Sequence, residues 1–218
     1  MWIKKWPKNI LNLFFPCFCL YCSAEGKIIC DQCLKKIPVR GKIRTNFYSL
    51  DKIIYFFNYR HPLVKKAIQT FKYPPYQKEI LNYLFLLIAP FWRKNKSLVQ
   101  QMKKNNFVIV PVPLTRRKKA QRGFNQSELI AQKFSQQFNL PLALNLVKKK
   151  KQTPSQTKLN REQRRKNVKD VWQVKDNCPR QIIIVDDVLT TGATITQMAQ
   201  ALEKAGAENI WAIILAKG

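Results

Sequence analysis

The segment Ile182–Thr194, IIIVDDVLTTGAT, decides the fold and carries the strongest functional pattern in the chain. It opens with four consecutive β-branched residues, as expected for a strand buried on both faces of a parallel sheet. Asp186 and Asp187 follow at the carboxyl end of that strand, the edge at which open α/β sheets bind ligands. Adjacent carboxylates at this edge can accept hydrogen bonds from vicinal hydroxyls or hold Mg²⁺, directly or through water.

The five residues after this strand predict an anion site at the start of a helix. They are small or hydroxyl-bearing, so the backbone can approach an anion closely while helix N-terminal amides point at it: Thr190, Thr191, Gly192, Ala193 and Thr194. Together, the acids and the turn predict a binding site for a sugar phosphate. The sugar's diol would face the carboxylates, and its phosphate would lie at the helix N-terminus. A strand ending in two acids also occurs in nucleotide hydrolases and phospho-acceptor domains, but the sequence has no GxxxxGK[ST] phosphate loop.

The flanking sequence predicts an α/β domain with a mainly parallel sheet, because strand and helix patterns alternate from residue 107 onward. A polar loop is expected at Leu114–Asn125. The expected strands are Ile53–Tyr59, Phe107–Pro113, Leu142–Val147, Val168–Val174, Gln181–Val185 and Ile210–Leu215. The expected helices are an apolar-faced segment with Leu63, Ala67, Ile68 and Phe71, then Ile80–Pro90, Ser127–Phe138 with Ser127 as its cap, and Thr194–Ala205.

Five of the six cysteines lie between Cys17 and Cys33. The spacing Cys19-x2-Cys22-x7-Cys30-x2-Cys33 gives two CxxC pairs that can present four thiolates to one tetrahedral Zn²⁺. With four sulfur ligands the metal would have no open position, so a structural role is expected. Disulfides are the alternative and would require export. Cys17 could replace Cys19 as a ligand.

The N-terminus imitates a signal peptide, but cleavage after Ala24 would discard three of the clustered cysteines. A retained, cytoplasmic N-terminus is therefore expected, with no stable membrane insertion. The expected organisation is a zinc-binding region at 1–45 and an α/β domain at 46–218. The polar stretch 148–170 is expected to form a flexible loop.

The composition favours anionic ligands, because 40 Lys and Arg face only 12 Asp and Glu, for a formal net charge of +28. The alternative is a solvated, lysine-rich surface without a specific partner.

The sequence resembles the type I phosphoribosyltransferases and, more narrowly, the ComF family of competence-associated ComFC proteins. The resemblance rests on the Ile182–Thr194 motif, the paired CxxC motifs, Lys72-Tyr73, Gln163–Val168 and the string VPVPLTRRKKAQRGFNQSELIA, which contains Arg122-Gly123-Phe124-Asn125-Gln126. It implies a phosphoribosyltransferase-like fold that binds 5-phosphoribosyl-1-pyrophosphate (PRPP) with Mg²⁺, and a role in DNA uptake during natural transformation. It also favours Cys19 over Cys17, since Phe15-Pro16 stands two residues before the first ligand.

By this resemblance, Asp186 and Asp187 would engage the ribose hydroxyls, and Thr190–Thr194 the 5-phosphate. The loop that contains Arg116 would face pyrophosphate. Arg161 and Arg165, in the closing loop, would neutralise the leaving pyrophosphate. Purine-salvage members carry a third acid where this chain has Thr190, so a general base is not visible; the only histidine, His61, is interpreted as structural. Phosphoribosyl transfer is favoured, to an acceptor that the sequence does not identify.

A rival hypothesis is a non-catalytic module of the competence machinery that binds single-stranded DNA or contacts a competence helicase. The basic segments Arg116–Arg122 and Lys148–Lys151 fit either the phosphates of PRPP or a nucleic-acid backbone.

Overall fold

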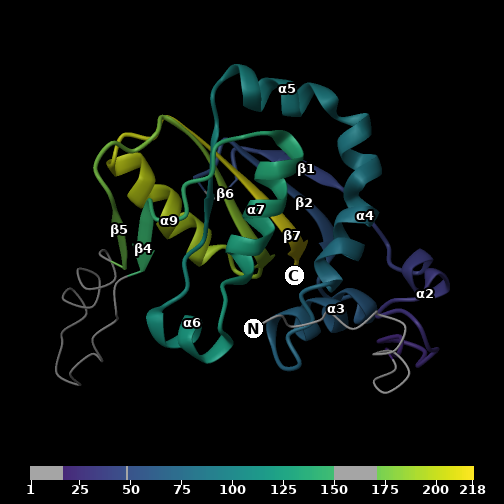
Figure 1. The fold of residues 1–218 in the computed structure, drawn as a ribbon. Helices are drawn as coiled ribbons and strands as arrows, with labels where there is room; N and C mark the ends of the chain where they lie inside the picture. Colours follow the sequence, from purple (N-terminus) through teal and green to yellow (C-terminus); the bar gives the residue numbers. More distant parts are fainter. Residues whose placement is uncertain (1–16, 48, 150–170) are drawn as a thin grey trace, which may run out of the picture.

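The computed structural model describes residues 17–47, 49–149 and 171–218. Its main sheet has five strands in the order β1-β2-β7-β6-β3 (Figure 1). All neighbouring pairs are parallel except β1 and β2, which are antiparallel. The strands of this sheet are β1 Lys42–Thr45, β2 Lys52–Asn58, β3 Val108–Pro111, β6 Gln181–Leu189 and β7 Asn209–Lys217.

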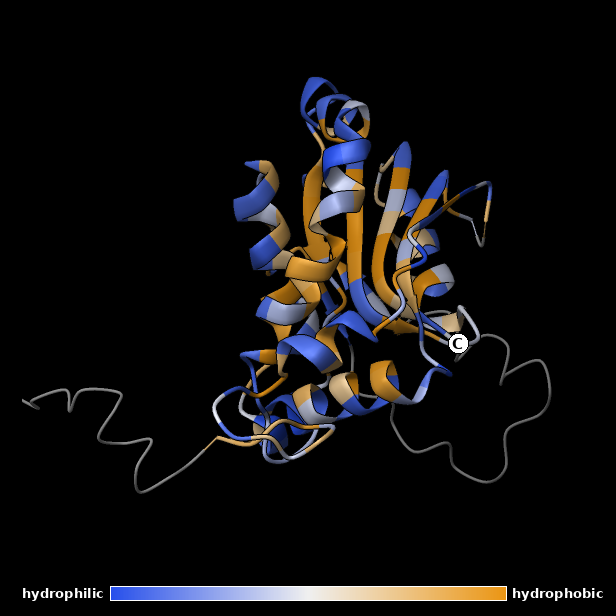
Figure 2. Cartoon of the chain, turned by 90° about the vertical axis from the view of Figure 1, so that its right-hand side faces the viewer, coloured by the Kyte–Doolittle hydropathy of each residue, from blue (hydrophilic) through white to orange (hydrophobic). Residues whose placement is uncertain are grey.

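Helices cover both faces of the sheet, as expected for a mainly parallel sheet (Figures 1 and 2). One face packs against α3 Pro62–Lys72, α4 Ile80–Lys94 and α7 Gln126–Phe138. The other face packs against α9 Ala193–Lys204 and a small hairpin of β4 Val147–Lys149 and β5 Trp172–Val174. The side chains of Ile182–Val185 are fully buried between these layers.

Three local expectations are corrected by the structure. Leu114–Asn125 is not a simple loop, because Arg116–Arg122 forms the helix α6, capped by the Thr115 hydroxyl and ended by Gly123 at a φ of 74°. Helix α7 begins at Gln126 with Asn125 as its cap, so Ser127 lies inside its first turn. Helix α5, Lys96–Lys104, was not expected, since its sequence is polar with a single buried residue, Met102.

The N-terminal cysteine region packs onto the face covered by α3 and α4. Cys19, Ile29, Leu34 and Ile37 belong to the same buried cluster as the apolar residues of those helices. The region contains the short helix α2, Asp31–Lys35. The division of the chain after residue 45 stays a prediction.

Within the three described ranges, every helix is too short or too polar to be a candidate membrane span.

Candidate functional site

The acid pair lies at the carboxyl edge of the sheet, within the last part of β6, and both carboxylates have partners. The Ser127 hydroxyl donates to Asp186 Oδ1 at 2.7 Å, and the Asp187 amide donates to the same oxygen at 2.9 Å. The Lys72 ammonium forms an ion pair with Asp187, at 3.1 Å from Oδ1 and 3.0 Å from Oδ2. Two helices that cover the same face of the sheet, α3 and α7, therefore position the acids.

Burial and neighbouring charges shift the pKa values of Asp186 and Lys72. Burial raises the pKa of the Asp186 carboxyl to about 7, and the charge of Asp187 acts in the same direction. The hydrogen bond from Ser127 and the charge of Lys72 oppose this rise. Burial alone would lower the pKa of Lys72, but the Asp187 carboxylate outweighs it and the net pKa of Lys72 is raised. The site thus places a carboxyl at Asp186 that titrates near neutral pH beside the ion pair of Lys72 and Asp187.

The string Arg122–Ser127 ties three elements together beside the acids. Asn125 caps α7 and donates from Nδ2 to the Val112 carbonyl, just after β3, at 3.0 Å. Gln126 donates from Nε2 to the Lys72 carbonyl at 3.3 Å and accepts from Arg122 at 3.1 Å. Phe124 packs against Phe71, with ring centroids 6.0 Å apart. Apart from Gly123, which ends α6, each residue of the string therefore packs or forms a hydrogen bond near the acid pair.

The residues after β6 form a tight turn that leads into α9. Gly192 stands at the N-cap with a φ of 80°, a left-handed conformation that glycine adopts without strain. The Ala193 amide donates to the Thr191 hydroxyl at 3.4 Å, and the Thr196 hydroxyl donates to the Gly192 carbonyl at 3.0 Å. Thr190, Thr191, Ala193 and Thr194 are all exposed. The start of α9 is therefore presented to solvent at the same edge as the acids.

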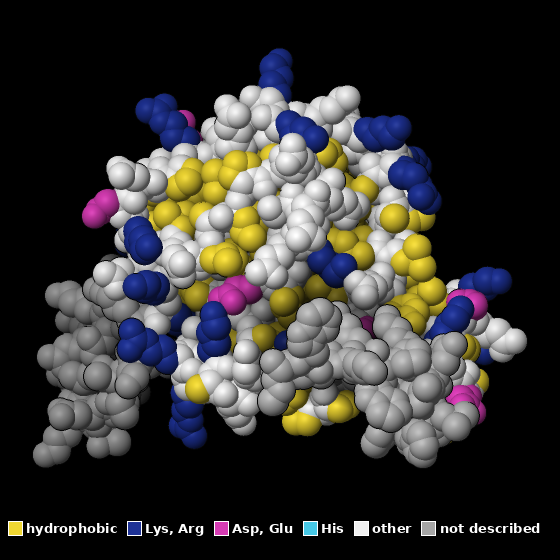
Figure 3. Space-filling model, viewed as in Figure 1, with side chains coloured by type: hydrophobic (Ala, Val, Ile, Leu, Met, Phe, Trp, Pro, Cys, Tyr) yellow, Lys and Arg dark blue, Asp and Glu magenta, His cyan; other side chains and the backbone are white. Residues whose placement is uncertain are grey.

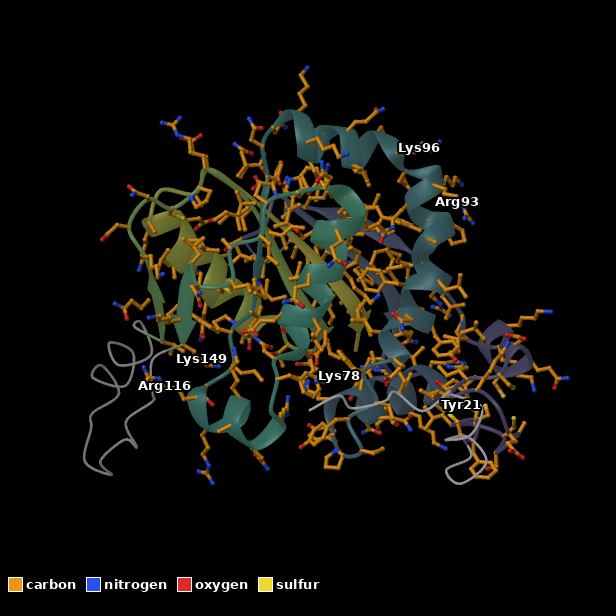
Figure 4. All side chains as sticks on the ribbon, viewed as in Figure 1. Tyr21, Lys78, Arg93, Lys96, Arg116 and Lys149 are labelled. Atoms are coloured by element: carbon orange, nitrogen blue, oxygen red, sulfur yellow. The ribbon has the colours of Figure 1, made fainter. Side chains whose placement is uncertain are left out.

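Basic side chains flank the acids on the β3 side. Arg116 opens α6 and Lys149 ends β4, and both are labelled in Figure 4. Burial lowers the pKa of Lys149, as does the nearby charge of Lys118, while the charge of Asp186 opposes them. Arg161 and Arg165, the other predicted phosphate ligands, lie outside the described residues. Lys and Arg far outnumber acids on this face of the molecule (Figure 3).

The four predicted cysteine ligands come together. The sulfur atoms of Cys19, Cys22, Cys30 and Cys33 all lie within 4.8 Å of one another, and Cys17 is not part of this cluster. Although burial acts in the opposite direction, the amides of Cys30, Cys22 and Tyr21 lower the pKa of the Cys19 thiol to about 6. A soft, four-thiol donor set of this kind is compatible with zinc.

Comparison with known proteins places the chain in a family. A family model described as "Phosphoribosyl transferase domain" matches residues 124–218. Competence protein F of Haemophilus influenzae is 31% identical over 206 residues, which cover 90% of this chain and 82% of that protein. This chain belongs to the ComF family.

Two further relatives of this ComF protein carry different names. DNA utilization protein YhgH of Escherichia coli K12 is 35% identical over 195 residues, covering 88% of this chain and 79% of that protein. Competence protein ComFC of Streptococcus pneumoniae is 29% identical over 126 residues, covering 58% of this chain and 54% of that protein. The expected family and the phosphoribosyltransferase-like fold are thus confirmed.

Two side chains of the ComF site were not predicted as site residues. Ser127 was interpreted only as a helix cap, and Lys72 only as part of a family pattern. Their contacts with the acids join positions 59 and 115 residues apart in the chain. In the sequence, the only indication was that Lys72 and Ser127 both lie within segments that resemble the ComF family.

Proposed function

We propose that this ComF protein binds PRPP with Mg²⁺ and acts as a phosphoribosyltransferase. The observation that carries the proposal is the position of Asp186 and Asp187 at the end of a buried strand, directly before the Gly192 turn and the start of α9. Carboxylates there can accept hydrogen bonds from the ribose hydroxyls. The turn and the first amides of α9 can hold the 5-phosphate.

In the proposed reaction, a lone pair on the acceptor attacks C1 of the ribose. The bond from C1 to the pyrophosphate oxygen breaks, pyrophosphate leaves with the electron pair, and the acceptor loses its proton. Arg116, Arg161 and Arg165 are proposed to neutralise the leaving group. Thr190 occupies the place of a third acid, so the transfer would depend on electrostatic stabilisation rather than on a strong base.

The acid pair fits a divalent cation. Two consecutive residues supply hard carboxylate oxygens. Burial, and then the charge of Asp187, raises the pKa of Asp186, so a bound cation would stabilise its ionised form. We propose that Asp186 and Asp187 would help to hold Mg²⁺, directly or through water. The ion would neutralise charge on the pyrophosphate when bound.

We further propose that the four-cysteine cluster binds one structural zinc ion. Four thiolates would fill a tetrahedral shell, so no position would remain for substrate. The role of the ion would be to fix the N-terminal region against α3.

The names of the relatives support a role in DNA uptake or utilisation. A second candidate, a non-catalytic module that contacts single-stranded DNA or a helicase, is favoured by α6. This helix has no buried residue and presents Arg116, Arg117 and Lys118 to solvent. Such a surface can track a phosphate backbone.

The first candidate is tested by titrating PRPP into the protein in the presence of Mg²⁺ and measuring the affinity by calorimetry. The double change Asp186→Asn and Asp187→Asn is expected to weaken binding more than about 100-fold, because charge-assisted hydrogen bonds contribute about 1.5–3 kcal/mol each. Asp176→Asn with Glu203→Gln is the control, since it removes two exposed acids elsewhere. Equal affinity in wild type and the acid-pair variant would refute the proposal. Pyrophosphate release with a panel of acceptors then tests turnover.

A further inference from the structure

A pocket lies at the same edge of the sheet as the acid pair, on the side away from α6. It has a volume of about 300 Å³ and lies where β1 begins and β2 and β7 end. Four of its lining residues are cations, and none is an acid: Arg40, Lys42, Arg60 and Lys217. Tyr55 and Phe57 also line it. Lys42 and Lys217 lie on β1 and β7, the two neighbours of β2 in the sheet, while Arg40 precedes β1 and Arg60 follows β2.

Within the described ranges, these four cations form no ion pair with a carboxylate. Among the described residues, the salt bridges join Lys27, Lys72, Lys119 and Arg180 to acids, and no pocket cation takes part in one. The Lys217 ammonium lies 4.9 Å from the Phe47 ring centroid and 5.5 Å from that of Tyr55. Clustered like charges repel one another, so a bound anion would stabilise this arrangement.

The pocket adjoins the proposed PRPP site through the strand register. Asp186 pairs with Ile214 on β7, and Ile214 pairs with Tyr55 on β2. Two strand spacings of about 4.8 Å therefore separate Tyr55 from Asp186, or roughly 10 Å. The Gly218 amide donates to the Leu189 carbonyl at 2.9 Å, which joins the pocket wall to the residue before the turn.

We infer that this pocket holds the oxyanionic end of the acceptor, a small molecule that bears a carboxylate or a phosphate. This inference rests on the proposed function. The main chain of Tyr55, in the pocket wall, lies roughly 10 Å from that of Asp186, a separation that a small acceptor can bridge with its nucleophile toward the proposed ribose and its oxyanion among the pocket cations. The volume lies at the lower end of ligand pockets, which suits a small molecule better than a polymer strand.

The test uses aromatic probes that lack a ribose phosphate, so that they do not imitate PRPP. Phenyl phosphate and benzoate supply the two oxyanions, and benzamide is the uncharged control. Each is titrated calorimetrically into the full chain, with and without saturating PRPP and Mg²⁺. The double change Arg40→Gln with Arg60→Gln is expected to lower the affinity for the tighter-binding oxyanion probe at least tenfold. Benzamide is expected to bind neither wild type nor this variant. Both substitutions keep the backbone bonds of these residues, and neither side chain is buried.

Arg93→Gln with Lys96→Gln is the matched control. It removes the same charge at the end of α4 and the start of α5 (Figure 4), from residues that do not line the pocket. It is expected to change the affinity less than twofold. Equal weakening by both double variants, or no oxyanion binding at all, would overturn the inference. So would a short oligonucleotide that binds far more tightly than the probes with the same dependence on Arg40 and Arg60.

The acid-pair variant separates this inference from the proposed function. Asp186→Asn with Asp187→Asn should lose PRPP but retain the oxyanion probe, and Arg40→Gln with Arg60→Gln should do the reverse. Loss of the probe in the acid-pair variant would place it in the PRPP site and overturn the inference. If wild type binds the probe but not PRPP, the proposed function and the acceptor role are both overturned, and only an oxyanion site remains.

Discussion

At the scale of single residues, the acid pair depends on neighbours that no local pattern identifies. The sequence predicted the two carboxylates as ligand-binding groups because they follow a buried strand at the edge where open α/β sheets bind ligands. It did not predict the Ser127 hydroxyl as their partner, because Ser127 stands where a helix cap is equally expected. Only the packing of α7 on β6 turns this hydroxyl toward Asp186. The chemistry of the acids was predictable, but their protonation was not.

Replacing Ser127 by alanine is expected to raise the pKa of Asp186 above its value of about 7. The lost hydrogen bond favours the ionised form, and a bond to a charged group is worth about 1.5–3 kcal/mol, or roughly one pH unit or more. Titration of the carboxyl carbon by NMR measures the change. Ser135→Ala is the control, since its hydroxyl donates to the Leu140 carbonyl at the other end of the same helix. An unchanged Asp186 pKa in Ser127→Ala would contradict the assignment.

The raised pKa of Asp186 also predicts a pH-dependent stability for the ligand-free protein. Between pH 4 and pH 7 the folded state binds more protons at this position than the unfolded state. Stability contributed by Asp186 is therefore present below pH 4 and lost as pH rises through about 7. An asparagine side chain does not titrate, so Asp186→Asn lacks this loss. Its free energy of unfolding should therefore exceed that of wild type by roughly 2–4 kcal/mol between pH 5 and pH 8. Urea unfolding at each pH measures the free energy of unfolding. If it depends on pH in the same way for wild type and Asp186→Asn, the raised pKa of Asp186 is contradicted.

At the scale of elements, strong periodicity was a sufficient guide and weak periodicity was not. Strand β6 and helix α9 were predicted within a few residues, since their apolar patterns are long and their ends are marked. Helix α6 was missed because it buries nothing, so no apolar period distinguishes it from a loop. The predicted strand Leu142–Val147 is reduced to a bridge between Leu142 and Ile109 and the beginning of β4.

Asn125 is expected to matter more than an ordinary cap, because it serves two elements. Asn125→Ala removes the cap of α7 and leaves the Val112 carbonyl without its side-chain donor, for an expected loss of about 2–4 kcal/mol in unfolding free energy. Asn125→Asp keeps an acceptor for the cap but removes the donor, so it should fall between wild type and alanine. Denaturant unfolding measures the order; a loss in Asn125→Ala below about 0.5 kcal/mol would contradict the double role.

At the scale of the whole molecule, the cysteine cluster is joined to the main domain by buried contacts. Cys19 and Cys33 belong to the same core cluster as α3 and α4, and the Tyr21 hydroxyl donates to the Leu63 carbonyl at 2.6 Å. Tyr21, which lies between Cys19 and Cys22 in the sequence, is labelled in Figure 4. The CxxC spacing predicted the cluster, but nothing in the sequence indicated the surface against which it packs.

Loss of the proposed zinc should therefore destabilise the whole chain, not the N-terminal region alone. A cost of about 3 kcal/mol would lower Tm by roughly 6–12 °C in a chain of this length. Calorimetry with metal analysis after chelation measures both. Cys22→Ser should lose the metal, whereas Cys17→Ser and Cys178→Ser should retain one ion per chain. Full metal content in Cys22→Ser would contradict the assignment.

The ion pair between Lys72 and Asp187 links positions 115 residues apart, and the matched family segment, 124–218, does not include the lysine. A fragment confined to that segment would hold both carboxylates and the turn, yet bury like charges without a counter-ion. During synthesis the lysine leaves the ribosome first, so α3 is available before the acids emerge. Splitting the gene within the polar stretch 150–170 would leave the lysine and the acids on separate pieces. Only reassociation of the pieces would then restore a charge-balanced site.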